Sequence, residues 1–166
     1  GSVQVAIGHS AAKSNTTGQR NLAIGYRAYE GSDTENDNVA IGYHAMVTNT
    51  AGGSGNTALG NYTGDAITSG DNNALFGKGA GGTINSGSDN VCLGASAGDG
   101  ITTGSDNIMI GVGINVSAAG NSNSIGLGQN FGIGANTFGV GKAGNIVSNV
   151  FTTNATFARN SDLHKK

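Results

Sequence analysis

A five-residue sequence that ends in glycine recurs seven times between Gln4 and Gly111, and it limits the possible folds more than any other feature. Residues 38–42 (NVAIG) are typical, with a polar residue, three apolar residues and a glycine. Each closing glycine stands 17 positions after the previous one, except for a single interval of 18. This period is too short for helical repeats or propeller blades, and it fits one coil of a parallel β-solenoid. The closing glycines are Gly8, Gly25, Gly42, Gly60, Gly77, Gly94 and Gly111.

The rest of each repeat predicts a second apolar segment and a turn. Ile67, Ile84 and Ile101 each stand seven positions after a closing glycine. Another glycine usually stands ten positions after the closing glycine, in a sequence such as SGSDN at residues 86–90. Glycine, aspartate and asparagine tolerate the positive φ values of tight turns. We therefore expect two short strands per coil, separated by a short connection and a turn.

Side chains alternate along a strand, so the first strand of each coil has two apolar faces. In residues 38–42, Val39 and Ile41 share one face and Ala40 lies on the other. We expect the bulky row to fill the inside of the coil. The small row would then lie outside, where another backbone can approach closely at a subunit interface. This small row consists of Ala6, Ala23, Ala40 and Ala58.

The composition indicates a repetitive architecture or a core that is shared between chains. Val, Ile, Leu and Phe together account for 33 of the 166 residues, and the net charge is only −2. So few large apolar side chains offer little burial to offset the conformational entropy of folding, while the low charge argues against disorder. We expect an all-β, homotrimeric parallel solenoid, or β-roll, with three chains around one axis. A single-chain solenoid with capped ends is the alternative.

The repeat divides the chain into three parts. Residues 1–120 contain the seven coils with the 17-residue period. In residues 121–143 an apolar residue followed by glycine recurs at every seventh or eighth position, which predicts tighter coils. Residues 144–166 are expected to form a terminal β segment, with two strands within residues 145–157, and a polar tail.

The NVAIG-like strands and the Ser/Thr-Gly-x-Asp-Asn turns resemble two related groups of trimeric fibre proteins. One group is the heads of trimeric autotransporter adhesins, which are left-handed parallel β-rolls with a shorter repeat. The other is phage tail fibres and bacterial surface fibres that end in a self-cleaving intramolecular chaperone. Ser161-Asp162, with Lys165 and Lys166 after it, is similar to the start of such a chaperone but lacks its Arg-Leu-Lys order. The 17-residue period favours the second group.

Either resemblance implies an extracellular, homotrimeric fibre segment on a cell surface or a virion. Its function would be adhesion, or binding of a receptor on a host or prey cell. The partner would be a cell-surface glycan or protein. The alternative is a passive shaft or spacer of a tail fibre or adhesin, which only holds a binding tip away from the surface.

A group of aromatic and basic residues in the N-terminal repeats is the candidate ligand site. Four tyrosines follow closing glycines by one to four positions, and an arginine and a histidine stand beside them. Tyrosine suits contacts with sugars and proteins because it combines an apolar ring with a hydroxyl. The alternative is that these side chains only pack beside neighbouring coils. The candidate residues are Tyr26, Arg27, Tyr29, Tyr43, His44 and Tyr62.

Two polar columns share the turn. Stacked asparagine amides can form hydrogen bonds from coil to coil, so we interpret the asparagine column as a structural ladder rather than a ligand site. Asp37, Asp89 and Asp106 form a partial acidic column, which is either solvated or bridged by a cation. The ladder consists of Asn21, Asn38, Asn56, Asn73, Asn90 and Asn107.

Several classes of function find no support in the sequence. Scattered lysines and arginines form no basic patch for nucleic acid, and no apolar stretch is long enough to cross a membrane. The single cysteine, Cys92, occupies the small row and is expected in the core. No catalytic motif, cofactor motif or metal-ligand spacing is present, and Asn85 interrupts the threonine ladder that ice binding would need. We expect a protein that is not an enzyme and has no cofactor.

Overall fold

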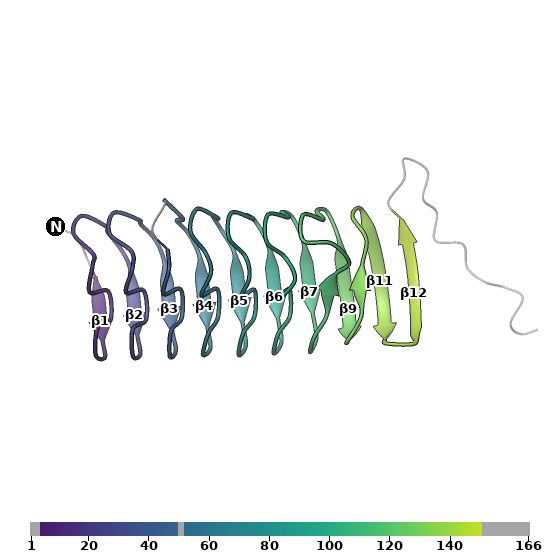
Figure 1. Ribbon diagram of the computed structural model, residues 1–166, viewed down its shortest axis with the longest axis horizontal. Coiled ribbons are helices and arrows are strands. Elements are labelled where there is room, and N and C mark those ends of the chain that lie inside the picture. The colour runs from purple at the N-terminus through teal and green to yellow at the C-terminus, as the bar shows by residue number, and fades with distance from the viewer. Residues whose placement is uncertain (1–3, 50–51, 151–166) are drawn as a thin grey trace, which may run out of the picture.

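The computed structural model describes residues 4–49 and 52–150, which form a parallel β-solenoid as expected. The strands stack one per coil along the long axis (Figure 1). The described residues form no helix, and so none that could cross a membrane. The main sheet consists of β1 (Val5–Ile7), β2 (Leu22–Ile24), β3 (Val39–Ile41), β4 (Thr57–Leu59), β5 (Ala74–Phe76), β6 (Val91–Leu93), β7 (Ile108–Ile110), β9 (Ile125–Gln129), β11 (Thr137–Lys142) and β12 (Asn145–Val150).

Each of the first six long coils has one short strand, from β1 to β6, rather than the two strands expected. The seventh has β7 and a second strand, β8 (Asn115–Val116). The strands pair in register, so that Ala23 lies beside Ala40 and Ala40 beside Ala58. The second apolar segment forms turns, and its isoleucines Ile67 and Ile84 point into the core, where they are fully buried. The chain therefore returns to the sheet through turns that are hydrogen-bonded from coil to coil.

The closing glycine of each repeat is required by the backbone. Gly42 has φ +140°, a conformation that residues with a Cβ rarely adopt. A Cβ on Gly42 would also lie 2.3 Å from the carbonyl oxygen of Gly60 in the next coil. The same two restrictions apply at the other closing glycines, which explains why this residue recurs without exception.

The expected assignment of the two strand faces is wrong. The middle residue of each strand from β2 to β7 is buried, and Ala23, Ala40 and Ala58 are fully buried, whereas Ala6 of the first coil is exposed. The bulky flanking residues point outward, and Leu59 and Leu93 are 41% and 48% exposed. The reason is that the turns fill the narrow interior from the opposite side, so they leave space for only one inward side chain per strand.

The strand and the turn of a coil fill the core in different proportions along the axis. Ala23 and Ala40 are small, and the fully buried Tyr29 and Met46 come from the turns of the same coils. In later coils the strand supplies Leu75, and the turn supplies Gly81, where a Cβ would lie 2.8 Å from the Leu75 side chain. This compensation keeps the interior closely packed, as protein cores require.

The C-terminal part differs from the expected tighter coils. β9 and β11 pair with Ile125 opposite Phe138, so one coil here runs from residue 125 to residue 137. The short repeat between them forms β10 (Gly132–Ile133), which pairs with β8 (Asn115–Val116) in a separate two-stranded sheet. β12 is a strand, as expected, and runs antiparallel to β11 at the end of the sheet. Residues 151–166, with the second expected strand, the tail and the chaperone-like sequence, lie outside the described residues.

The asparagine ladder is buried and connects every long coil to the next. The Asn73 backbone N–H donates to Asn56 Oδ1 at 2.9 Å, and the Asn90 N–H donates to Asn73 Oδ1 at 3.1 Å. The Asn90 amide nitrogen also donates to the carbonyl of Gly104 at 3.0 Å, which fixes the turn. The ladder ends where the Ser124 N–H donates to Asn107 Oδ1.

A second ladder runs beside the first and was not expected. Its members stand two positions before the members of the asparagine ladder, and each backbone N–H donates to the side-chain oxygen of the next member. The Ser88 N–H, for example, donates to Ser105 Oγ at 3.0 Å. The members are Gln19, Asn36, Ser54, Asp71, Ser88, Ser105 and Ser122. They differ in residue type, so the sequence does not show them as a repeat. Every member after Gln19 nevertheless supplies a side-chain acceptor.

Candidate functional site

Five aromatic rings on the first four coils form a continuous column on the surface, which we call the aromatic column. Its members are His9, Tyr26, Tyr43, His44 and Tyr62. The ring centroids of Tyr26 and Tyr43 are 5.3 Å apart at 13°, and those of His9 and Tyr26 are 5.5 Å apart at 14°. These distances and angles are typical of stacked aromatic pairs. The register of the coils thus brings together residues that are 17 to 19 positions apart in sequence.

A histidine packs beside two tyrosines in the middle of the column. The His44 ring lies 4.3 Å from Tyr43, nearly parallel to it, and 5.7 Å from Tyr62. Its Nε2 atom is buried and has no hydrogen-bond partner. The three tyrosines of the column are each between 40% and 44% exposed. The column is therefore partly covered by its own members and partly open to solvent.

Large residues with left-handed backbone conformations stand at the second position after three of the closing glycines. Arg27, His44 and Tyr62 have φ values of 54°, 55° and 58°. The other coils have serine or glycine at this position. A bulky residue in this conformation costs on the order of 1 kcal/mol, and such costs concentrate at functional sites. The sequence thus retains large side chains where glycine would fit the backbone better.

The structure separates the six predicted ligand residues into two groups. Tyr26, Tyr43, His44 and Tyr62 lie in the column, and Arg27 lies beside it with its guanidinium paired to Glu30. Tyr29, in contrast, is fully buried, and its hydroxyl accepts a hydrogen bond from Asn38 Nδ2 at 2.7 Å. Burial raises the pKa of Tyr29 to about 12. His9 was not predicted, although its position directly after Gly8 matches those of Tyr26 and Tyr43.

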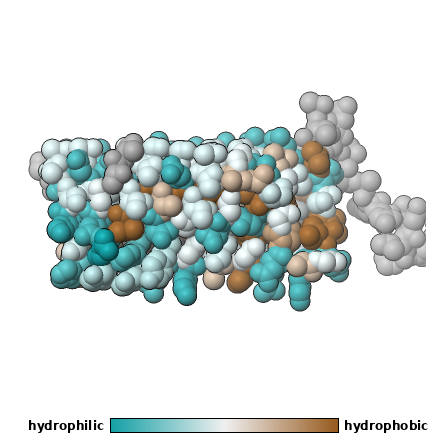
Figure 2. Space-filling view, in the orientation of Figure 1, coloured by the Kyte–Doolittle hydropathy of each residue, from teal (hydrophilic) through white to brown (hydrophobic). Residues whose placement is uncertain are grey.

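A second candidate surface is the outer face of the main sheet, which we call the apolar face. Two residues of each strand from β1 to β7 point outward there, and all are apolar except Thr57. A continuous apolar surface over so many coils is typical of protein–protein interfaces. The surface shown in Figure 2 is mostly hydrophilic or neutral, and hydrophobic residues gather at the end that carries β11 and β12. The residues of the apolar face that are more than a third exposed are Val5, Ile7, Leu59, Val91, Leu93 and Ile110, and Val140 of β11 continues them.

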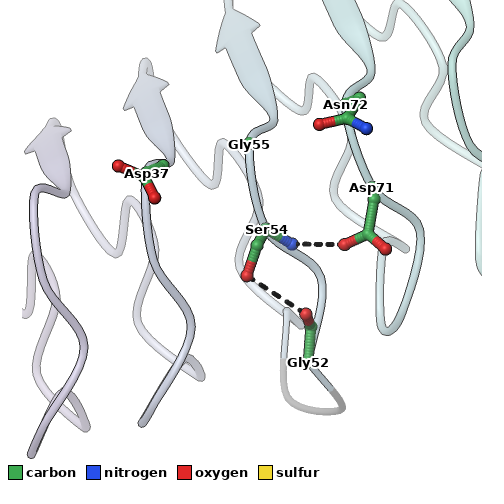
Figure 3. Close-up of a pocket in the computed structure, with 6 residues that line it drawn as sticks. All are labelled: Asp37, Gly52, Ser54, Gly55, Asp71 and Asn72. Atoms are coloured by element: carbon green, nitrogen blue, oxygen red, sulfur yellow. Dashed lines mark hydrogen bonds between the residues drawn. The ribbon is translucent and has the colours of Figure 1, made fainter.

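The third feature is an open hollow of about 530 Å³ beside the extra residue of the third repeat (Figure 3). Its carboxylates already have partners. Asp37 accepts two hydrogen bonds from Arg20, at 2.5 and 2.6 Å, which lowers the pKa of the Asp37 carboxyl. Asp71 Oδ1 accepts the Ser54 N–H at 2.7 Å. Gly52, Gly55 and Asn72 complete the lining.

Metal and thiol chemistry gain no support from these features. Within residues 4–49 and 52–150, no three His, Cys, Asp or Glu side chains are grouped to hold a metal ion. Cys92 is buried in the inward row, as expected, and burial raises the pKa of its thiol to about 12. Such a thiol is protonated and shielded at neutral pH.

Of these three features, the aromatic column and the apolar face remain as surfaces that can recognise another molecule. The column offers ring edges, hydroxyls and a neighbouring guanidinium, whereas the face offers extended apolar area. Comparison of the chain with protein-family models, curated proteins and solved structures finds no significant match.

Proposed function

We propose that the chain is a non-enzymatic segment of a homotrimeric extracellular fibre that serves adhesion or receptor binding on a cell surface or virion. The observation that carries the proposal is the apolar face. The bulky row points out of the coil, so a single chain leaves a row of Val, Ile and Leu side chains partly in water. Three chains that pack these faces around one axis would bury more apolar area than a single chain can bury alone.

The aromatic column supports the binding part of the proposal. It breaks the regularity of the repeat at a conformational cost, and it lies only on the first four coils. A trimer would present three copies of the column. Simultaneous contacts then convert weak binding of a cell-surface glycan or protein at each copy into useful avidity. The second candidate is a passive shaft, favoured by the regularity of the coils from β5 to β7.

The test of the assembly uses two charged substitutions on the apolar face. Leu93→Glu with Ile110→Glu should convert the trimer to monomers, because it would bury unpaired charges at the interface. Ser86→Glu with Thr103→Glu, on exposed turns of the same region, is the matched control and should remain trimeric. Equal masses for the two double variants would contradict the proposed interface.

The test of binding uses a glycan array. We expect wild-type protein to bind a subset of glycans, and we expect the triple variant Tyr26→Ala, Tyr43→Ala, Tyr62→Ala to lose that binding. A triple alanine variant at Ser69, Ser86 and Thr103 controls for general surface changes. Binding that survives the loss of the tyrosines would reject the column as the site, and a trimer that binds nothing would favour the passive shaft.

A further inference from the structure

The orientation of the rings decides how the aromatic column can meet a ligand. His9, Tyr26 and Tyr43 occupy the same position in successive coils, and each ring plane lies within 14° of the next. Coils in a parallel sheet are separated by roughly 4.8 Å, so the facing sides of these three rings cover one another, whereas Tyr62 meets Tyr43 edge-on at 65°. A sugar therefore cannot stack between the three parallel rings. Tyr26, which has a ring on each side, meets solvent mainly through its ring edge and hydroxyl.

Ring edges favour a different ligand from ring faces. The edge of an aromatic ring carries the positive part of its quadrupole, while the face carries the negative part. Tyrosine hydroxyls and histidine N–H groups add hydrogen-bond donors along the same edge. A column of stacked rings thus presents a line of donors and partial positive charge, which complements an anion.

Charged residues of both signs lie beside the column. Arg27 lies close enough to Tyr26 and Tyr43 to interact electrostatically with both. Lys78 is exposed and occupies the ring position two coils beyond Tyr43, with Asn61 between them. The opposing charges are Glu30, which pairs with Arg27, and Asp65, which lies within electrostatic reach of His44. Glu30 therefore masks the cation that is nearest to the exposed rings.

We propose that the aromatic column binds an acidic glycan, a sugar chain bearing carboxylates, through ring edges, hydroxyls and Arg27. The inference rests on the proposed function in taking the column as the receptor site, and it names the ligand class. Sugar hydroxyls and carboxylates would accept hydrogen bonds from successive coils as the glycan runs along the fibre axis. Arg27 would exchange its bond to Glu30 for one to a ligand carboxylate.

The experiment compares polygalacturonate with its methyl ester, because esterification removes the charge of each carboxylate and adds only a methyl group. Binding of each polymer to the wild-type protein is measured by calorimetry at low and physiological salt. We expect polygalacturonate to bind, with weaker affinity at higher salt, and the ester to bind at least tenfold more weakly.

Two substitutions with opposite expected effects distinguish edge recognition from general attraction of a polyanion. Glu30→Gln releases Arg27 and should raise the affinity about two- to fivefold per site, whereas Arg27→Gln should lower it by a similar factor. Lys142→Gln, which removes a cation at the far end of the solenoid, should leave the affinity unchanged. If Lys142→Gln weakens binding as much as Arg27→Gln does, any cation on the surface attracts the polyanion equally, and the inference is wrong.

The remaining outcomes separate this inference from the proposed function. Equal binding of polygalacturonate and its ester, lost in the tyrosine variant, would retain the column as a receptor site but overturn the acidic ligand. The absence of binding to either polymer would also overturn the acidic ligand. Undiminished binding of polygalacturonate by the triple tyrosine variant would overturn both the ligand class and the column as the site.

Discussion

The coils of β2 and β3 and the coils of β5 to β7 share one backbone path but differ in both core and surface. In the later coils the interior is dry and apolar, with Leu75, Ile84 and Ile101 fully buried. In the earlier coils the positions of those isoleucines hold Ser32 and Asn49, whose buried Oγ and Oδ1 atoms form no hydrogen bond of ordinary length. An unsatisfied buried polar atom costs about 1–3 kcal/mol, so we expect the earlier coils to be less stable.

The surface shows the same division. The aromatic column, with its left-handed Arg27, His44 and Tyr62 beside or within it, covers the earlier coils, whereas Gly79 and Ser96 take that position later. On the proposed function, stability and recognition lie on different coils. The regular coils hold the solenoid together, and the irregular ones carry large side chains that the backbone accommodates at a cost.

Glu35 also belongs to the irregular region. It stands where most coils have glycine, yet it is 4% exposed. Its carboxylate accepts the N–H groups of Asp33 and Thr34 at 2.8 and 3.0 Å, and that of Gly52 at 3.1 Å. These backbone donors replace the hydrogen bonds from water that the carboxylate loses when it is buried. Glu35 connects the second coil to the enlarged turn of the third.

The largest expected effect separates the two kinds of core. Ile84→Ala should lower the free energy of unfolding by about 2–5 kcal/mol, because it leaves a cavity in a packed interior. Ser32→Ala, at the same coil position in the polar core, should leave stability unchanged or raise it, since the Ser32 hydroxyl forms no hydrogen bond of ordinary length. Urea denaturation followed by circular dichroism measures both. Equal losses would show that the two cores do not differ.

The ladder should matter about equally in both regions. Asn90→Ala removes the acceptor of the Asn107 N–H and the donor to the Gly104 carbonyl, and it should cost about 2–4 kcal/mol. Asn38→Ala should cost about as much, because the Asn38 side chain forms three hydrogen bonds, one of them to the buried Tyr29 hydroxyl, against four for Asn90. The midpoints of thermal unfolding compare the two variants. A loss in only one of them would show that the ladder stabilises only one region.

Two carboxyl groups should respond to pH with opposite signs. Arg20 lowers the pKa of Asp37, so this pair stabilises the fold above the ordinary carboxyl pKa and its contribution is lost as pH falls through the lowered value. Burial raises the pKa of Asp65, so its ionisation destabilises the fold as pH rises from the ordinary value to the raised one. Denaturation measured from strongly acidic to neutral pH should show a weaker acid loss for Asp37→Asn. It should show a steeper rise of stability with pH for Asp65→Asn, and identical profiles would contradict both assignments.

The smallest effect concerns the left-handed positions. Ser96→Gly should raise the free energy of unfolding by about 0.5–1 kcal/mol, because glycine adopts this φ without strain. His44→Gly should bring no such gain, since the lost ring contacts with Tyr43 and Tyr62 offset the relief. Differential scanning calorimetry measures the change in stability of both variants. A clear gain in His44→Gly would mean that the stacked rings contribute little.

The sequence predicts the solenoid but not the direction in which its side chains point. The period and the closing glycines follow from backbone requirements that repeat in every coil, so they are visible in one sequence. The inward position of Ala40 is not visible, because it depends on Tyr29 and Met46 filling the interior from the turn. Tyr29 is buried rather than exposed for the same reason. The second ladder is not visible in the sequence because its positions, such as Asp71 and Ser88, fill one role with different residue types.

The central claim is that the apolar face joins three chains, and size-exclusion chromatography with light scattering tests it most directly. The account predicts a mass near three times the 16.3 kDa of the chain, independent of concentration over the micromolar range. A stable, folded species with the mass of one chain would contradict it, because Ile7 and Leu93 would then remain in water without a partner.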